Sequence, residues 1–439
     1  MTGRLDWRAW PGRPLRGSLS VPGDKSVSHR AVMLAAVATG STRIEGFLEG
    51  EDTRATAAIL ARLGVRIEAP DAGTRIVHGV GLHGLRPADG PLDCGNAGTG
   101  MRLLAGLLAG QAFDSVLVGD ASLSARPMQR VTVPLAAMGA AIDTGPGGTA
   151  PLRVEGGRPL AGVEHRLAVA SAQVKSALLL AGLYARGATR VREPHPTRDY
   201  TERLLAAFGA DIAVAGDAIE LRPGRPLVSP GTLLVPGDFS SAAFFLVAAS
   251  LVPGSDLRLR GIGLDPRRTG LIDCLREMGA DIEVELSRPG QAGPVGDLRV
   301  RHAPLRGIEV PPARVPDMID EFPVLFAAAA LAQGRTRVAG AAELRVKESD
   351  RIAVMARALR TLGVAIEELP DGACITGGAI AGGRVDSAGD HRCAMALAVA
   401  AQRAAGEVVV GDCANVATSF PGFAALAQSS GFGLAEEAV

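Results

Sequence analysis

The sequence predicts an α/β protein of two domains, each made of three copies of one repeating unit. The stretches 21–68 and 235–283 follow the same plan, since both open on Val-Pro-Gly-Asp, continue into an apolar run and end on a Gly-x-x-Ile pattern. Weaker copies begin near Asp93, Ala168, Arg314 and Val385. Starts that recur about every 70 residues are typical of a chain built from one repeated supersecondary unit.

The elements of each copy come in one order. A polar cluster is followed by an Ala/Leu-rich helix of about fourteen residues that ends at glycine, then by a short β-branched strand, a second helix and a closing strand. The first helix of a copy, such as the run that begins at Ala31, is apolar on nearly every face. A helix of this kind must be buried.

The length of 439 residues exceeds what one core usually spans, so two domains of about 200 residues each are expected. The second Val-Pro-Gly-Asp motif, at 235–238, marks the start of the second half. We therefore predict an N-terminal domain at 21–236 and a C-terminal domain formed by 1–20 and 237–439. Residues 1–20 would complete a strand in the C-terminal domain, and the two chain crossings would form a double hinge.

The composition favours a cytoplasmic protein that binds a small molecule. Acidic and basic residues balance at 46 each and aromatic residues are 3 %, which argues against a nucleic-acid groove. No apolar run is long enough to span a bilayer, and residues 1–20 lack the apolar core of a signal peptide. The 5 cysteines form no Cys-x-x-Cys pair, so neither a disulfide framework nor a zinc site is indicated, and no metal is expected.

The polar clusters at the helix starts predict an anion site. Helices related by rotation would present their N-termini on one face, where free N–H groups attract anions. Lysine occurs only at Lys25, Lys175 and Lys347 among the 46 basic residues, and we expect a compact ammonium to be kept where it contacts a phosphate. The residues concentrated at the helix starts are Lys25, Ser26, Arg30, Asn96, Gly98, Thr99, Arg102, Ser171, Gln173, Lys175, Ser240, Ser241, Asp320, Glu321, His391 and Arg392.

Shorter motifs that could indicate a binding site also have simpler structural explanations. Gly79–Gly84 matches Gly-x-Gly-x-x-Gly, but no helix pattern follows it, so a dinucleotide site is rejected. No Gly-x-x-x-x-Gly-Lys motif exists, which excludes a P-loop. The segment 96–100 can hold an anion through backbone N–H groups or can be a tight turn. Lys347 and Arg351 have i, i+4 spacing and would share one helical face, as they would in a solvated charged helix.

Eight motifs in order resemble the 5-enolpyruvylshikimate-3-phosphate synthase family, in the class with the Ser-Ala-Gln-Val-Lys-Ser signature. They are DKSVSHR, GNAGTGMR, ARP at 125–127, SAQVKS, TRD at 197–199, MIDEFP, RVKESDR and DHR, and they cover nearly the whole chain. The resemblance implies two domains, each of three βαβαββ repeats with buried parallel helices, and an active site in the interdomain cleft.

The resemblance also implies the reaction. The family transfers the enolpyruvyl group of phosphoenolpyruvate to the 5-hydroxyl of shikimate 3-phosphate and releases phosphate, in aromatic amino-acid biosynthesis. It needs no metal or organic cofactor, and we expect a monomer without nucleic-acid or membrane partners. Two phosphates and two carboxylates bring about −5 charges into one site, so many cations should line it. Family members with alanine at the position of Gly98 resist the herbicide glyphosate, and glycine here implies sensitivity.

The site residues follow by matching motifs. Shikimate 3-phosphate would be bound by Lys25, Ser26, Arg30, Ser171, Ala172, Gln173, Arg198, Asp320 and Lys347. Phosphoenolpyruvate would be bound by Lys25, Asn96, Gly98, Thr99, Arg126, Gln173, Glu348, Arg351 and Arg392. Asp320 would accept the proton of the 5-hydroxyl, and either Glu348 or Lys25 would protonate the methylene carbon.

Departures from the family pattern and alternative functions remain. The other class of the family has a second serine where this chain has Ala172 and a lysine where it has Thr418, and Tyr200 stands where histidine is more frequent. A sister enolpyruvyl transferase that acts on UDP-N-acetylglucosamine has a cysteine at the position of Ala121, which disfavours that function. A non-enzymatic anion-binding repeat protein would have to explain why carboxylates such as Asp320 lie among the cations.

Overall fold

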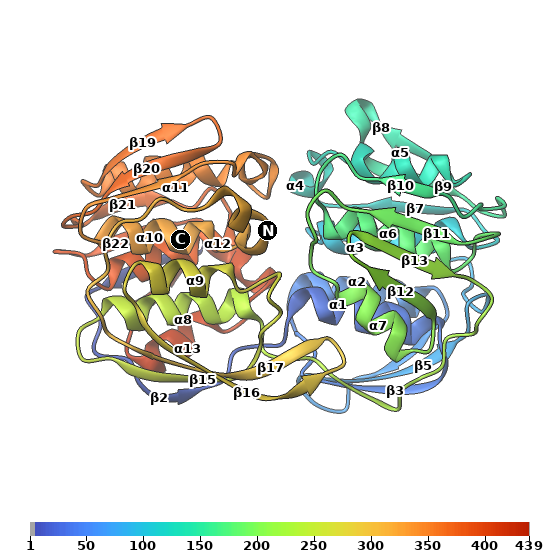
Figure 1. The fold of residues 1–439 in the computed structure, drawn as a ribbon, viewed down its shortest axis with the longest axis horizontal. Coiled ribbons are helices and arrows are strands. Elements are labelled where there is room, and N and C mark those ends of the chain that lie inside the picture. The colour runs from blue at the N-terminus through green and yellow to red at the C-terminus, as the bar shows by residue number, and fades with distance from the viewer. Residues whose placement is uncertain (1–4, 439) are drawn as a thin grey trace. The chain divides into compact units, whose positions relative to one another are not determined.

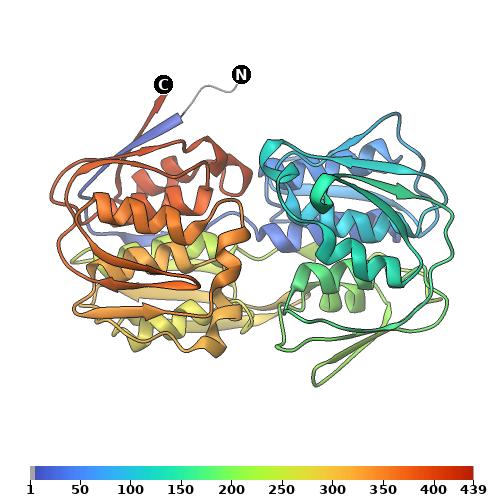
Figure 2. The same ribbon diagram turned by 90° about the horizontal axis from the view of Figure 1, so that it is seen from above.

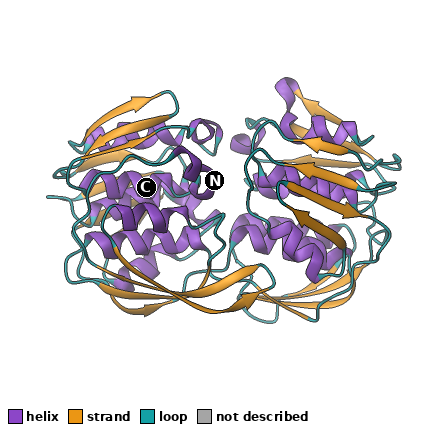
Figure 3. Ribbon diagram, in the orientation of Figure 1, coloured by secondary structure: helices purple, strands orange, loops and turns teal. Residues whose placement is uncertain are grey.

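A computed structural model describes residues 5–438 of the chain, which form six small sheets covered by helices (Figures 1 and 3). The chain divides into two compact units. Of the described residues, unit 1 contains those up to Pro22, Gly237–Pro289 and those from Pro294 onwards, whereas unit 2 contains Gly23–Pro236 and Gly290–Gly293. The α/β fold class predicted from the sequence is confirmed, and each unit holds three sheets.

Unit 2 contains three repeats of the order strand, helix, strand, helix, strand, strand. The first has β14 (Thr232–Leu234), α1 (Lys25–Val37), β3 (Thr39–Glu45), α2 (Glu51–Arg62), β4 (Arg66–Glu68) and β5 (Thr74–Val80). The second has β6 (Leu92–Asp93), α3 (Gly98–Ala109), β7 (Ser115–Val118), α4 (Ala121–Ser124), α5 (Gln129–Ala137), β8 (Ala141–Gly145) and β9 (Thr149–Glu155). The third has β10 (Glu164–Arg166), α6 (Ala172–Gly182), β11 (Thr189–Arg192), α7 (Tyr200–Ala207), β12 (Asp211–Ala215) and β13 (Ala218–Arg222).

Unit 1 follows the same order. Its first repeat has β2 (Arg16–Leu19), α8 (Phe239–Leu251), β15 (Asp256–Gly263), α9 (Gly270–Glu277), β16 (Asp281–Gly290) and β17 (Gly293–Arg301). Its second has α10 (Phe322–Leu331), β18 (Arg335–Val338), α11 (Arg351–Thr361), β19 (Ala365–Leu369) and β20 (Gly372–Thr376). Its third has β21 (Gly383–Asp386), α12 (His391–Ala401), β22 (Val408–Gly411), α13 (Phe423–Ser430), β23 (Gly433–Ala438) and β1 (Leu5–Trp10).

Each four-stranded sheet combines one parallel pair of strands with antiparallel strands. In the order β6-β7-β9-β8, the strands β6 and β7 are parallel, which requires the crossover through α3, while β9 is antiparallel to both of its neighbours. The sheet β10-β11-β13-β12 repeats this order. In the second repeat of unit 1 the first strand is reduced to isolated bridges at Arg306 and Glu309.

The N-terminal segment supplies strands to two sheets of unit 1. Strand β2 pairs in parallel with β15, and β1 lies between β22 and β23, antiparallel to both. Figure 2 shows β1 beside β23. The sequence patterns predicted that residues 1–20 would complete a strand in the C-terminal domain, and residues 1–4 of this segment lie outside the described residues.

The tip of the β16–β17 hairpin belongs to unit 2, although the body of the hairpin belongs to unit 1. The side chain of Gln291 donates to the carbonyl of Thr232 at 2.8 Å and accepts from the amide of Leu234 at 3.3 Å. Ala292 is buried in the core of unit 2. The chain thus returns to unit 2 for a few residues at this hairpin tip, where no motif marks the segment.

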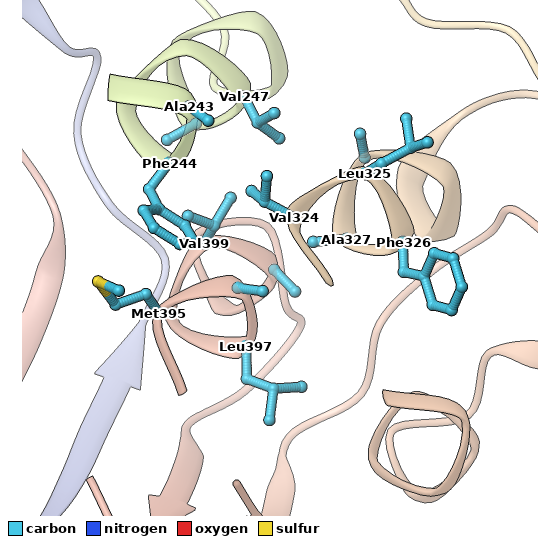
Figure 4. Close-up of a cluster of buried hydrophobic side chains, with 14 of the residues drawn as sticks. Ala243, Phe244, Val247, Val324, Leu325, Phe326, Ala327, Met395, Leu397 and Val399 are labelled. Atoms are coloured by element: carbon cyan, nitrogen blue, oxygen red, sulfur yellow. The ribbon is translucent and has the colours of Figure 1, made fainter. Parts of the chain in front are cut away.

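The first helix of each repeat forms the core of its unit, as the apolar patterns predict. In unit 1, α8, α10 and α12 pack against one another through residues such as Phe244, Val324 and Val399 (Figure 4). In unit 2, α3 packs against α6. A Cβ on Gly106 would lie 2.2 Å from the carbonyl oxygen of Ala177, so glycine is required for these helices to approach so closely. The polar residues that begin these helices are thereby fixed to a rigid core.

Candidate active site

The residues predicted to form the site lie in two groups, one in each unit. Unit 2 holds Lys25, Ser26, Arg30, Asn96, Gly98, Thr99, Arg126, Ser171, Ala172, Gln173 and Arg198. Unit 1 holds Asp320, Lys347, Glu348, Arg351 and Arg392. In both groups most residues stand at or just before the first turn of a buried helix. Each group is described within its own unit.

The first turn of α1 carries Lys25 and Ser26. Asp24 caps this helix, because its carboxylate accepts from the amide of Val27 at 2.8 Å. The ammonium of Lys25 forms an ion pair with Asp52, and the Lys25 side chain is 16 % exposed. Lys25 is thus held at the start of α1 with part of its surface accessible to a ligand.

Arg30 is buried one turn further along α1. Its Nε donates to Thr201 Oγ1 at 2.7 Å, and its terminal nitrogens donate to Ser176 Oγ at 2.8 Å and to the carbonyl of Ser26 at 2.9 Å. Burial lowers the pKa of Arg30 to about 10, and the nearby positive charge of Arg198 acts in the same direction. Arg30 therefore stays protonated at neutral pH, although its environment disfavours the charge.

The start of α3 places two guanidinium groups around Gly98. A Cβ on this glycine would lie 3.0 Å from a terminal nitrogen of Arg102 and 3.1 Å from one of Arg126. Arg126 also donates to Asn96 Oδ1 at 2.6 Å. The segment 96–100 is therefore more than a tight turn, because its backbone stands directly against two cations.

Gln173 connects the starts of α3 and α6. Its amide nitrogen donates to Thr99 Oγ1 at 2.9 Å, and its amide oxygen accepts from Arg102 at 3.0 Å. Ser171 caps α6 by accepting from the amide of Val174 at 3.4 Å, and Ala172 is the first residue of this helix. Arg102 was not assigned to either substrate from the sequence, although it stood among the helix-start residues.

Asp320 is the centre of the group in unit 1. Its carboxylate oxygens lie 3.6 Å from a nitrogen of Arg351, 3.9 Å from Nζ of Lys347 and 3.9 Å from a nitrogen of Arg268. Burial lowers the pKa of Lys347, while Asp320 and Glu343 oppose that shift. Three cations are thus grouped around one carboxylate, an arrangement that suits an anionic ligand.

Lys347 does not share a helical face with Arg351, as the i, i+4 spacing suggested. Residues Ala342–Val346 form a short 3₁₀ helix, Lys347 follows it in extended conformation, and α11 begins only at Arg351. The prediction was wrong because Asp350, whose carboxylate accepts from the amide of Ala353 at 3.0 Å, caps the helix at that point. The two cations still meet at Asp320.

Arg351 is buried in a network of carboxylates. Its Nε lies 2.8 Å from Asp390 and a terminal nitrogen lies 2.5 Å from Glu348. Burial acts to lower the pKa of Arg351, but the negative charges of Asp390, Glu348 and Asp320 outweigh it, so the pKa is raised. Asp390, which is fully buried, has a lowered pKa because Arg351 and His391 outweigh its desolvation.

Arg392 adds a further cation beside Asp320. One of its terminal nitrogens donates to the carbonyl of Asp320 at 3.3 Å and lies 3.9 Å from Glu321. Its backbone amide donates to Asp390 at 2.9 Å, so the same carboxylate caps α12 and pairs with Arg351. Burial raises the pKa of Glu321.

Arg268 and Glu321 are site neighbours to which the sequence interpretation gave no role. Arg268 lies 3.1 Å from Asp238 and donates to Ser240 at 2.6 Å, and Ser240 donates to Glu321. Glu321 stood among the helix-start residues predicted from the sequence, without assignment to a substrate. Arg268 stands beside Arg267 in a polar segment, and nothing in the sequence distinguishes the buried arginine from the other.

Lys175 does not fit the idea that each scarce lysine contacts a phosphate. Its side chain is 1 % exposed and lies 2.7 Å from both Glu193 and Glu202. Of the three positions that depart from the family pattern, Ala172 begins α6, Thr418 is buried and donates to the carbonyl of Asn415 at 2.7 Å, and Tyr200 is buried at the first position of α7.

Within residues 5–438, no cluster of three or more histidine, cysteine or acidic side chains could hold a metal ion. No helix in this range is long and apolar enough to cross a membrane. The five cysteines are all buried and free.

The repeat fold with charged clusters at its helix starts defines a protein of the enolpyruvyl transferase fold. The enolpyruvyl transferase NikO from Streptomyces tendae superposes with a TM-score of 0.81 over 100 % of both chains, at only 19 % identity, which supports the fold alone. An EPSP synthase structure from Acinetobacter baumannii matches with a TM-score of 0.88 and 47 % identity, covering 99 % of this chain and 100 % of that one.

The sequence comparisons define the family. The family model described as EPSP synthase (3-phosphoshikimate 1-carboxyvinyltransferase) matches residues 10–426. Relatives named 3-phosphoshikimate 1-carboxyvinyltransferase from Xanthomonas campestris pv. campestris (strain B100) and Xanthomonas oryzae pv. oryzae (strain PXO99A) are 65 % identical over 98 % of this chain, and over 98 % and 97 % of their own lengths. The chain belongs to the EPSP synthase family.

We predict that Asp390→Asn destabilises unit 1. At neutral pH the variant should lose about 3 kcal/mol or more of unfolding free energy, since removing one partner leaves the buried Arg351 without its fully buried counter-charge. The pKa of Asp390 is lowered in the folded state, so its stabilisation is present above an unfolded pKa of about 3.9 and is lost as the pH falls through the folded value. The difference from the parent should therefore narrow in acid.

Denaturant unfolding at pH 7 and pH 3 would measure both effects. Asp256→Asn is the matched control, because Asp256 also pairs with an arginine at 2.8 Å but is exposed, and its loss should leave stability unchanged. Equal stability of Asp390→Asn and the parent at pH 7 would contradict the role assigned to this buried pair.

Proposed function

We propose that this chain transfers the enolpyruvyl group of phosphoenolpyruvate to the 5-hydroxyl of shikimate 3-phosphate and releases phosphate. The observation that carries this function is the 65 % identity, over 98 % of the chain, to relatives named 3-phosphoshikimate 1-carboxyvinyltransferase. The charged clusters of both units also support this function. Two phosphates and two carboxylates amount to about −5 charges, and both units hold grouped cations that can bind them.

The two clusters are proposed to act together, in a cleft between the domains 21–236 and 1–20 with 237–439. Shikimate 3-phosphate would be bound by Lys25, Ser26, Arg30, Ser171, Ala172, Gln173, Arg198, Asp320 and Lys347. Phosphoenolpyruvate would be bound by Lys25, Asn96, Gly98, Thr99, Arg126, Gln173, Glu348, Arg351 and Arg392. The arginines around Gly98 and the cations around Asp320 support these assignments. Domain closure around both substrates would exclude water from the reaction.

The proposed mechanism is acid–base catalysis without a metal or an organic cofactor. Asp320 accepts the proton of the 5-hydroxyl, whose oxygen attacks the C2 carbon of phosphoenolpyruvate, while Glu348 or Lys25 donates a proton to the methylene carbon. The resulting tetrahedral ketal then loses phosphate, and the new methyl group returns a proton to restore the double bond. The cations stabilise the charge of the departing phosphate.

The alternatives are less consistent with the residues present. A UDP-N-acetylglucosamine enolpyruvyl transferase would place a cysteine at the position of Ala121, which here begins the short helix α4. A protein that only binds anions would have no use for Asp320 as a proton acceptor. The cytoplasmic location and the monomeric state remain predictions.

Phosphate release with each acceptor would test the proposed function. We expect release from phosphoenolpyruvate when shikimate 3-phosphate is present and none with UDP-N-acetylglucosamine. Release with the nucleotide sugar alone would identify the sister enzyme. Absence of release with both acceptors, together with binding of phosphoenolpyruvate, would favour the protein that only binds anions.

Asp320→Asn should lower turnover by about 10²–10⁴, the range by which a general base contributes, because the amide keeps the shape but cannot accept a proton. Equilibrium binding of shikimate 3-phosphate should persist, since Lys347 and Arg351 remain in place. The exposed Asp256→Asn serves again as the control with parental turnover. A turnover close to that of the parent would exclude Asp320 as the base.

Gly98→Ala should weaken inhibition by glyphosate more than it raises KM for phosphoenolpyruvate. The added methyl group would stand 3.0 and 3.1 Å from the guanidinium groups of Arg102 and Arg126, a distance at which one carbon is felt. The family resemblance implies that glyphosate is slightly longer than the substrate, so it should lose more. The control is Gly378→Ala, because a Cβ at that glycine meets nothing within 4 Å. Equal losses for both ligands would show that Gly98 does not line the pocket.

A further inference from the structure

A buried ion cluster lies behind the proposed phosphate-binding residues of unit 2. Nζ of Lys175 on α6 lies 2.7 Å from Glu193, which follows β11, and 2.7 Å from Glu202 on α7. The side chains of all three are at most 4 % exposed. An anion from solution cannot reach this ammonium, so Lys175 does not act as a substrate ligand.

The cluster instead holds the segment that carries Arg198. Glu193 accepts a hydrogen bond from the hydroxyl of Thr197 and another from its amide at 3.2 Å. Nζ of Lys175 donates to the carbonyl of Thr197 at 3.4 Å. Both backbone polar groups and the side chain of Thr197 are therefore bound to the ion cluster, one residue before Arg198.

The charges give a reason for such a support. Arg198 and Arg30 lie close enough that their like charges repel, which contributes to the lowered pKa of Arg30, whereas the carboxylate of Glu202 attracts Arg30. A ligand that binds both arginines needs them close together in spite of this repulsion. Fixing the backbone beside Arg198 lowers the conformational entropy that is lost when such a ligand binds.

We propose that Lys175 is a positioning residue, which acts through Glu193 and Thr197 to present Arg198 to the phosphate of shikimate 3-phosphate. The inference rests on the proposed function. A lysine suits this position because its compact ammonium donates in three directions, to two carboxylates and a carbonyl, whereas the planar fork of arginine favours one bidentate partner. The competing explanation is a cluster that only stabilises unit 2, as a buried ion network can do once all its members are paired.

Thr197→Val separates the two explanations. It removes the hydroxyl that donates to Glu193 and leaves Lys175, both glutamates and the volume of the side chain in place. We expect KM for shikimate 3-phosphate to rise about three- to tenfold, the size expected for the net contribution of one typical hydrogen bond. The values of kcat and of KM for phosphoenolpyruvate should stay within about twofold, because Arg126 and Arg351 do not depend on this segment.

Thr189→Val is the matched control. Thr189 is also buried in unit 2, at the start of β11, and its hydroxyl has no hydrogen-bond partner. The control should keep the parental KM for both substrates. If Thr197→Val leaves KM for shikimate 3-phosphate unchanged, or if both substrates weaken equally, the positioning role is wrong. If KM for shikimate 3-phosphate rises equally in both valine variants, the cause is a general change of packing in unit 2, and the positioning role is likewise wrong.

A double-mutant cycle with Arg198→Ala completes the test. If the threonine acts through Arg198, the penalty from Thr197→Val should disappear in the Arg198→Ala background, whereas additive penalties would overturn the proposal. The cycle also distinguishes this failure from failure of the proposed function. Absence of any phosphate release that depends on shikimate 3-phosphate in the parent would overturn the function itself, before the variants are compared.

Discussion

The structure depends on charged groups being anchored to an apolar core without losing their counter-charges. Helices such as α8 and α10 are buried over their whole length, so whatever begins them is held at the edge of the core, where water compensates charge poorly. Asp390 shows how the constraint is met, because one fully buried carboxylate both pairs with Arg351 and caps α12. A ligand that arrives at these helix starts therefore meets cations whose positions are already fixed.

The same constraint explains why carboxylates lie among the cations of an anion site. In unit 1, Asp320 stands beside three cations, and in unit 2, Asp52 pairs with Lys25. If these carboxylates were absent, like charges would repel one another in the free protein and the cluster would loosen. With them, the cations stay ordered in the free protein. Electrostatic preorganisation of this kind contributes to catalysis because the protein need not reorganise when charge develops.

The repeated architecture could be predicted from the sequence, but the partners of the charged side chains could not. Periodicity survives in a single chain because every repeat must bury the same kind of helix, so the stretches 21–68 and 235–283 still match. The structural role of Lys175 could not be predicted, because its partners Glu193 and Glu202 belong to other elements and are ordinary surface residues by type. The prediction that Lys347 and Arg351 share a helical face failed for a related reason. The i, i+4 spacing assumes that both residues belong to one helix, but this helix begins only after its cap, Asp350. The hairpin tip at Gln291 carries no motif at all.

The scarcity of lysine acquires a more general explanation from these contacts. Each of the three lysines pairs with carboxylate groups: Lys25 with Asp52, Lys175 with two glutamates, and Lys347 with Asp320 and Glu343. What differs is access, since the side chains of Lys25 and Lys347 are 16 % and 19 % exposed and that of Lys175 is 1 % exposed. A phosphate can replace or join a carboxylate only where the ammonium is reachable. A lysine ammonium with several anionic neighbours can therefore bind a ligand where it is partly exposed, and can support the surrounding structure where it is buried.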